Sequence, residues 1–111
     1  MITEDGKAKI RDLITSEFTI LKIGNGGDTT NPMASELDVP LASITASTTS
    51  SGASAVDYKG IFTGADISGQ NIKEIGIFNA SGVMLGRVNF DSLGPFTSSD
   101  TIEIIFTIEV E

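Results

Sequence analysis

The chain contains no cysteine, no histidine and no tryptophan among its 111 residues. Without cysteine, disulfides, thiolate nucleophiles and cysteine-based metal sites are excluded, so the fold must depend on packing or assembly. Without histidine, the chain lacks the usual general base at neutral pH and the commonest zinc and iron ligand. A serine hydrolase is disfavoured too, because the sequence holds neither a G-x-S-x-G nor an S-x-x-K motif. We therefore predict that the protein is not an enzyme and has no catalytic residues, no cofactor and no metal ligands.

Basic residues are also scarce: seven Lys and Arg stand against fifteen Asp and Glu, for a formal net charge of -8. That charge repels phosphate backbones and anionic lipid surfaces, so we expect neither nucleic acid nor a membrane as a partner. The segment from Met1 to Asp5 is polar and acidic, and no apolar run approaches the roughly 18 residues of a transmembrane helix. We expect no signal peptide and a protein that is made and used in soluble form.

β-branched residues are abundant, with fifteen Ile, twelve Thr and five Val. Such side chains lose rotamer freedom in helices and pack well on pleated sheets, which favours an all-β fold. A length of 111 residues is typical of one domain with one core. We therefore predict a single β-sandwich domain over residues 1–111.

Residues 4–16 form the one helical candidate. Thr3 is a suitable N-cap, and the acidic Glu4 and Asp5 follow in the first turn, where the helix dipole favours negative charge. We expect this helix to rest on the strands through one apolar face, formed by Ile10, Leu13 and Ile14. The basic side chains are predicted to lie mostly off that face: Lys7, Lys9 and Arg11.

Strand patterns fill the rest of the chain, at residues 18–23, 43–51, 55–64, 72–78, 83–90 and 101–111. The third of these strands, 55–64, alternates so that Val56, Tyr58 and Phe62 lie near one face. The last alternates most regularly, with five apolar side chains on one face: Ile102, Ile104, Phe106, Ile108 and Val110. Ile105 breaks the alternation and is either a scattered surface residue or part of an interface. With one short N-terminal helix and no crossover helices, the pattern predicts an antiparallel, jelly-roll-like β-sandwich.

A glycine-rich turn, Gly24 to Asp28, ends the first strand, and we expect its glycines to adopt positive φ angles. A long connection follows over residues 28–42, in which Pro32 and Pro40 lack backbone donors. A connection of that length in a small domain is typically functional or covered by a neighbour.

Carboxylates are plentiful but show neither EF-hand spacing nor a paired acid placement: Asp28, Glu36, Asp38, Asp57, Asp66, Glu74 and Asp100. We expect them on solvated loops and strand faces, with calcium held by Asp28, Glu36 or Asp38 as a minor option. Arg87 is expected to pair with Glu74 across neighbouring strands. On an exposed face such a pair contributes well under about 1 kcal/mol.

Residues 71–91 form the central β-hairpin of the prediction, because two apolar runs flank the break Asn79-Ala80-Ser81-Gly82. We expect Gly76 inside a strand, where a ring or a backbone approaches too closely for a Cβ. The hairpin reads Glu74-Ile75-Gly76-Ile77-Phe78-Asn79-Ala80, then Met84-Leu85-Gly86-Arg87 and Phe90. This order resembles a recurrent pattern in small structural proteins of tailed phages and related viruses, the tail-fibre or tail-collar-like family. The N-terminal helix and the closing Asp100 to Phe106 strand are also similar to that family.

The resemblance implies a virion building block in a tail, a fibre or a capsid-surface (decoration) position. Its motif residues are then structural: Glu74, Gly76, Ile77, Phe78, Asn79, Met84, Leu85, Arg87 and Phe90. The expected partners are further copies of the chain, for example in a trimer, and other virion proteins. The expected location is the virion, after synthesis in the host cytoplasm. The alternative is a carbohydrate- or receptor-binding module that uses the 24–42 and 50–54 loops, with Tyr58 as its aromatic platform.

Overall fold

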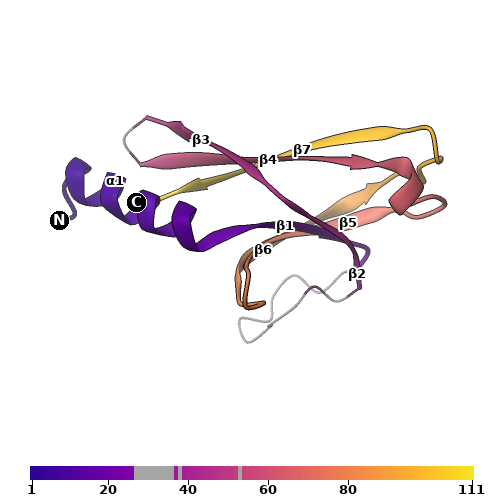
Figure 1. Cartoon of the computed structure of the whole chain (residues 1–111), viewed down its shortest axis with the longest axis horizontal. Helices are drawn as coiled ribbons and strands as arrows, with labels where there is room; N and C mark the ends of the chain where they lie inside the picture. Colours follow the sequence, from indigo (N-terminus) through magenta and orange to yellow (C-terminus); the bar gives the residue numbers. More distant parts are fainter. Residues whose placement is uncertain (27–36, 38, 53) are drawn as a thin grey trace.

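Strands make up most of the chain in the computed structural model, which describes residues 1–26, 37, 39–52 and 54–111 (Figure 1). The N-terminal helix α1 spans Glu4–Glu17, and a 3-10 turn, η1, spans Gly64–Asp66. The strands are β1 (Phe18–Gly24), β2 (Pro40–Thr45), β3 (Ser47–Ser51), β4 (Ala55–Thr63), β5 (Ile72–Asn79), β6 (Met84–Leu93) and β7 (Thr101–Glu109).

The strands form two antiparallel sheets stacked on one another, with strand orders β2-β1-β5-β6 and β3-β4-β7. In Figure 1 the second sheet lies above the first, and α1 stands at one end of the stack beside the C-terminus. The all-β, antiparallel sandwich with one N-terminal helix that the sequence predicts is therefore confirmed. Its long axis is 46 Å, against 29 and 26 Å for the other two.

The main core lies between the sheets and is apolar apart from one phenol. Its buried members are Leu21, Ile23, Val56, Tyr58, Phe62, Ile67, Ile72, Ile77 and Ile104. The predicted inward face of β4 is confirmed, because Val56, Tyr58 and Phe62 are all buried. The alternation of β7 is confirmed as well, since Ile104 is buried while Ile105 is 59% exposed.

The predicted strand over residues 43–51 is wrong, because this stretch belongs to two strands in different sheets. β2 pairs with β1 as far as Thr45, and β3 pairs with β4 from Ser47 onward. Between them Ala46 donates its N–H to Thr19 O at 2.9 Å and packs against the core. The Ser/Thr-rich sequence on either side carries no apolar alternation that could have marked the crossing.

The central hairpin is confirmed as β5 and β6, with Gly82 at a φ of 86° in the turn. Asn79 fixes this turn through its side chain, whose Oδ1 accepts from Val83 N at 2.8 Å. Its Nδ2 donates to Glu17 Oε1 at 3.0 Å, which ties the hairpin to the end of α1. An Asn that bonds a nearby backbone group in this way is typical of tight turns.

Helix α1 begins as predicted, with Thr3 Oγ1 accepting from Gly6 N at 3.1 Å. Its predicted packing face is wrong at Leu13, which is 62% exposed, and at Ile10, which also reaches solvent, whereas Ile14 is half-buried. The helix instead turns Arg11 toward the sandwich, where Nη1 donates to Gly52 O at 2.8 Å. The reason is the neighbour: at this end α1 meets the β3–β4 turn, whose backbone carbonyl a guanidinium can satisfy and an aliphatic side chain cannot. No helix in the described ranges is long and apolar enough to cross a membrane.

Candidate functional site

The two faces of the β2-β1-β5-β6 sheet differ in what covers them. Residues directly opposite one another on paired strands share a face. Leu21, Ile77 and Gly86 are opposite one another and lie on the inner face, toward the other sheet. Lys22, Gly76 and Arg87 form the neighbouring row, as do Gly24, Glu74 and Asn89, and both rows lie on the outer face. The charged and polar residues of the central hairpin therefore gather on the side away from the main core.

Glu74 is the organising residue of the outer face and has no solvent-exposed surface. Its Oε2 accepts from Gly26 N at 2.6 Å and from Val39 N at 2.9 Å. Asn25 N donates to Val39 O at 2.9 Å, which strengthens the same junction. Hydrogen bonds from backbone N–H groups to a carboxylate are among the strong ones in proteins. One carboxylate thus holds together two backbone positions that are thirteen residues apart in sequence.

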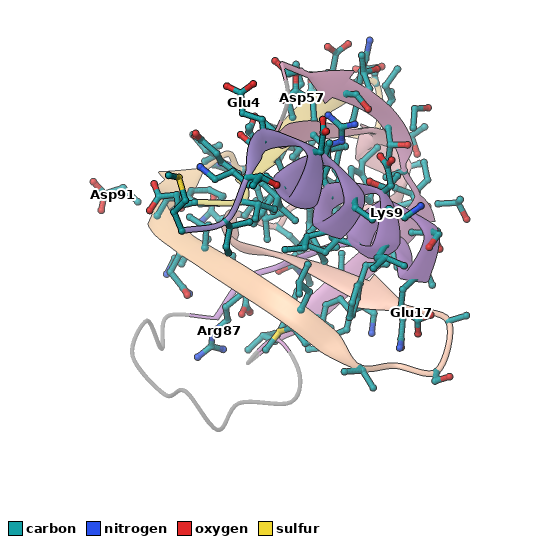
Figure 2. The ribbon with its side chains drawn as sticks, turned by 90° about the vertical axis from the view of Figure 1, so that its left-hand side faces the viewer. Glu4, Lys9, Glu17, Asp57, Arg87 and Asp91 are labelled. Atoms are coloured by element: carbon teal, nitrogen blue, oxygen red, sulfur yellow. The ribbon has the colours of Figure 1, made fainter. Side chains whose placement is uncertain are left out.

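Arg87 and Asn89 complete this arrangement from β6. Arg87 Nη1 lies 4.0 Å from Glu74 Oε1, and the Arg87 side chain is only 7% exposed. Asn89 Nδ2 donates to Gly26 O at 3.2 Å. Figure 2 shows Arg87 on the side of β6 away from α1. We call Gly26, Val39, Glu74, Arg87 and Asn89 the Glu74 cluster.

The sequence predicts the Glu74–Arg87 pairing but places it wrongly in solvent. Both side chains are buried, because the backbone at Gly26 and Val39 closes over the carboxylate. The expected contribution of well under about 1 kcal/mol, which holds for exposed pairs, therefore does not apply. Removing one partner of a buried pair takes away a charge contact that solvent does not replace, which is costly.

Gly24 is required by this cluster and not by its backbone angles. A Cβ at Gly24 would lie 2.6 Å from Val39 O and 2.7 Å from Glu74 Oε2, closer than real contacts allow. The predicted positive φ angle is wrong for Gly24, since the described glycines with positive φ are Gly52, Gly69, Gly82 and Gly94. Gly27 and Asp28 lie outside the described residues.

A second apolar cluster lies beside the Glu74 cluster on the outer face. Phe78 is fully buried there, with Lys22 Nζ 4.2 Å from the centre of its ring. A Cβ at Gly76 would lie 2.9 Å from Phe78 Cε1 and 3.0 Å from Leu37 Cδ2. The prediction that a ring approaches Gly76 too closely for a side chain is therefore confirmed. The buried Leu37 reaches this face from a distant part of the sequence.

The remaining motif residues do not join the cluster. Ile77 is buried in the main core, and Phe90 packs against it while partly exposed. Met84 lies opposite Phe78 on β6 and is half-buried, whereas Leu85 faces solvent. Asn79 belongs to the hairpin turn described above. The motif thus divides into outer-face residues that bind distant backbone, core residues and one turn residue.

Tyr58 is not available as a binding platform, which overturns its role in the alternative function. Its ring is fully buried, and its hydroxyl donates to Phe18 O at 2.7 Å and lies 3.4 Å from Ile14 O. Burial raises the pKa of the phenol above its ordinary value, although a side-chain hydrogen bond with Thr15 acts in the opposite direction. Tyr58 therefore joins the end of α1 to the main core.

The other candidate carboxylates bind nearby groups or lie outside the described residues. Asp57 accepts from Thr107 Oγ1 at 2.7 Å, Asp66 from Thr63 Oγ1 at 3.2 Å, and Asp100 from Thr97 N at 2.7 Å. Within the ranges that the structure describes, no three acidic side chains are grouped as a metal site. The calcium option rests on Asp28, Glu36 and Asp38, all of which lie outside those ranges.

A groove of about 200 Å³ lies where the two sheets end beside β6 and β7, lined by Ile75, Val88, Ile105, Phe106 and Thr107. Val88 and Ile105 are each about half exposed there. A smaller depression of about 180 Å³ lies over β2, lined by Lys22, Pro40, Leu41, Ala42 and Ser43. The first is mainly apolar and suits contact with another apolar surface.

Sequence reasoning missed Gly26, Val39 and Lys22, which contact Glu74 or Phe78, and Asn89, which binds Gly26 O. The contacts of Gly26 and Val39 with Glu74 span 48 and 35 residues, so no local pattern encodes them. One signal was present: Gly24 is the last residue of an apolar strand, where a glycine can mark the close approach of a neighbouring group. No protein-family model matches the chain, and no curated protein is significantly similar to it.

Proposed function

We propose that the chain is a non-enzymatic structural protein of a virus particle, from a tailed phage or a related virus, and that it acts by self-association. The main observation behind the proposal is that the residues of the hairpin motif have structural roles in this fold. Glu74, Arg87, Asn79 and Gly76 bind or admit groups of the same chain and hold distant segments on the sheet. A motif with such roles maintains the fold of the protein, as expected of the structural virion proteins that the family resemblance implies.

The edge formed by β6 supports self-association. Among the described strands, β6 is an edge strand that pairs on one side only, as are β2, β3 and β7. Its ten residues include two charges, Arg87, which is turned to Glu74, and Asp91, which projects from the body (Figure 2). Monomeric proteins usually protect such an edge with charges, prolines or a covering segment. An edge that carries so few charges and no proline within the described residues is suited to being covered by another subunit.

The groove between β6 and β7 lies along the same side and supports the same proposal. Val88 and Ile105 line this groove. A test of the groove therefore decides whether Ile105 is a scattered surface residue or part of an interface. Apolar residues at the centre of an interface are the ones whose change disrupts association most.

Sedimentation velocity over a wide range of concentrations tests self-association. We expect a defined oligomer for the native chain and its loss in Val88→Lys, which places a charge in the groove. Ile61→Lys is the matched control, because Ile61 is similarly exposed on β4 but does not line the groove. A native chain that stays monomeric at every concentration contradicts the proposal.

The virion assignment needs its own test. Mass spectrometry of purified particles should find the chain in a fixed ratio to the other particle proteins. A glycan array separates the alternative function: the structural proposal predicts no binding, and specific glycan binding by a chain that is missing from particles would favour the binding module.

A further inference from the structure

Asn25-Gly26 is the one Asn-Gly pair of the sequence, and it lies at the Glu74 cluster. Asparagine followed by glycine is prone to deamidation, because glycine has no side chain to obstruct attack by its own backbone nitrogen. In that reaction Gly26 N forms a bond to Asn25 Cγ while the Cγ–Nδ2 bond breaks. Ammonia leaves with the proton of the Gly26 N–H, and water then opens the cyclic imide to aspartate or isoaspartate.

Hydrogen bonds hold the backbone on both sides of the reacting residue. Asn25 N donates to Val39 O at 2.9 Å, and Gly26 N donates to Glu74 Oε2 at 2.6 Å. Ring closure removes the proton from Gly26 N and moves that nitrogen toward Asn25 Cγ. The bond to Glu74 therefore has to break before the ring can close.

We propose that Asn25-Gly26 is a latent deamidation site that the buried Glu74 carboxylate keeps unreacted in the folded protein. The Glu74 carboxylate is also placed to accept the proton of Gly26 N, and that role would speed up deamidation. It is far too weak a base to remove an amide proton before ring closure, so the restraint on the nitrogen outweighs it. The sign of the effect distinguishes the two roles.

The modification would also prevent the cluster from forming again. Within the described ranges Asn25 Oδ1 is buried without a hydrogen-bond partner, and aspartate at this position places a negative charge one residue from the Gly26 N–H that binds the buried Glu74. Isoaspartate adds a backbone methylene between two groups that Glu74 and Val39 now hold in register. Like charges at a buried site disfavour each other's ionised form. Each modified molecule therefore loses the junction of Gly26 and Val39 permanently.

The experiment follows deamidation at Asn25 by peptide mapping with mass spectrometry, which separates aspartate from isoaspartate, during incubation at mildly alkaline pH. We expect the folded native chain to react about ten- to a hundredfold more slowly than the same chain in urea, as the loss of a hydrogen bond to a charged group predicts. Asn71, Asn79 and Asn89 serve as internal controls, because none of them precedes glycine.

Glu74→Gln tests the carboxylate itself, with Glu103→Gln on the exposed part of β7 as the matched control. For a Glu74→Gln chain that circular dichroism shows to be folded, we expect a rate at least about tenfold above that of the native chain. Glu103→Gln should leave the rate unchanged. A folded Glu74→Gln chain that reacts at the native rate or more slowly overturns the proposal. If Glu74→Gln does not fold, equal rates for the native chain in buffer and in urea overturn it instead.

Discussion

On the inner face of β5, Ile75 and Ile77 pack against the opposite sheet, whereas on the outer face Glu74 and Phe78 are covered by distant residues of the chain. The inner face is apolar, and its contacts are shared among many neighbours. Among the described residues, the outer face combines the buried Phe78 and Leu37 side chains with one carboxylate, one guanidinium and a few backbone groups. Burial is almost complete on both faces, but only on the outer face does it depend on charge pairing.

Because of this difference, we expect substitutions on the two faces to lower the stability of the protein for different reasons. Loss of apolar volume from the inner core leaves a cavity that neighbours partly fill, so its cost varies with how well the site collapses. Loss of Glu74 or Arg87 removes a charged partner from a buried pair, and no apolar neighbour can replace it. Four predictions test or sharpen this contrast, from the largest expected effect to the smallest.

Removing the Glu74 carboxylate should be the most damaging change. Glu74→Ala removes the carboxylate that lies 4.0 Å from the buried Arg87 guanidinium and takes the acceptor from Gly26 N and Val39 N. We expect the free energy of unfolding to fall by about 3–5 kcal/mol, as for other broken buried pairs. Arg87→Ala should fall in the same range. Urea denaturation at a fixed protein concentration measures both.

Glu103→Ala is the control for that prediction. Glu103 pairs with Lys59 at 3.7 Å, and both side chains are about half exposed. An exposed pair contributes less than about 1 kcal/mol. Equal costs for Glu74→Ala and Glu103→Ala would show that the Glu74 cluster is open to solvent.

Phe78→Ala tests whether the outer face is a true second core. We expect a loss of about 3–5 kcal/mol, similar to large-to-small changes in the main core. Ile77→Ala, at the next position on the inner face, should cost about 2–5 kcal/mol. A Phe78→Ala cost below about 1 kcal/mol in the same denaturation experiment would mean that this face carries little of the stability.

Gly76→Val should overpack the outer face, because Phe78 Cε1 and Leu37 Cδ2 already occupy the space of its Cβ. The expected cost is about 1–3 kcal/mol, read from thermal melts and urea curves. Gly86→Val is the matched control on β6, where a Cβ would meet nothing within 4 Å. The control should change stability by no more than about 0.5 kcal/mol, since a β-branched residue suits a strand. A larger loss of stability for Gly86→Val than for Gly76→Val would contradict the close packing around Gly76.

Tyr58→Phe should have the smallest effect, about 1 kcal/mol, because it removes one hydroxyl that bonds Phe18 O. Burial raises the pKa of this phenol, so the folded state binds its proton more tightly than the unfolded state. The resulting stability is fully present below the unfolded pKa of about 10 and is lost as pH rises through the higher folded pKa. Tyr58 is the one tyrosine in the chain, so phenolate absorbance during an alkaline titration reports it alone. A midpoint equal to that of the urea-unfolded chain would contradict the burial.

Features with a regular local pattern could be predicted from the sequence. The alternation of β7, the hairpin of β5 and β6, the inward face of β4 and the start of α1 each follow from a few consecutive residues. The role of Gly76 also followed, because glycine inside an apolar strand implies a close neighbour.

Features that depend on distant residues could not be predicted. Alternation identifies one buried face of a strand but gives no sign that the other face is covered by Gly26, Leu37 and Val39. Glu74 and Arg87 therefore looked like a solvated pair. The packing of Arg11 instead of Leu13 has the same origin, since it depends on a carbonyl at Gly52. The strand crossing at Ala46 left no mark because small polar residues fit either sheet.

Because of the crossing at Ala46, the two sheets are joined by continuous chain along one side of the sandwich and not along the opposite side. On one side β2 continues directly into β3, and the Ala46 N–H bond to Thr19 O reinforces the joint. On the other side β6 and β7 end their sheets, with no strand shared between them and a groove where they meet. We therefore expect local opening between the two sheets to begin at β6 and β7. The backbone amide hydrogens of these strands should exchange with solvent before those of β1 and β5.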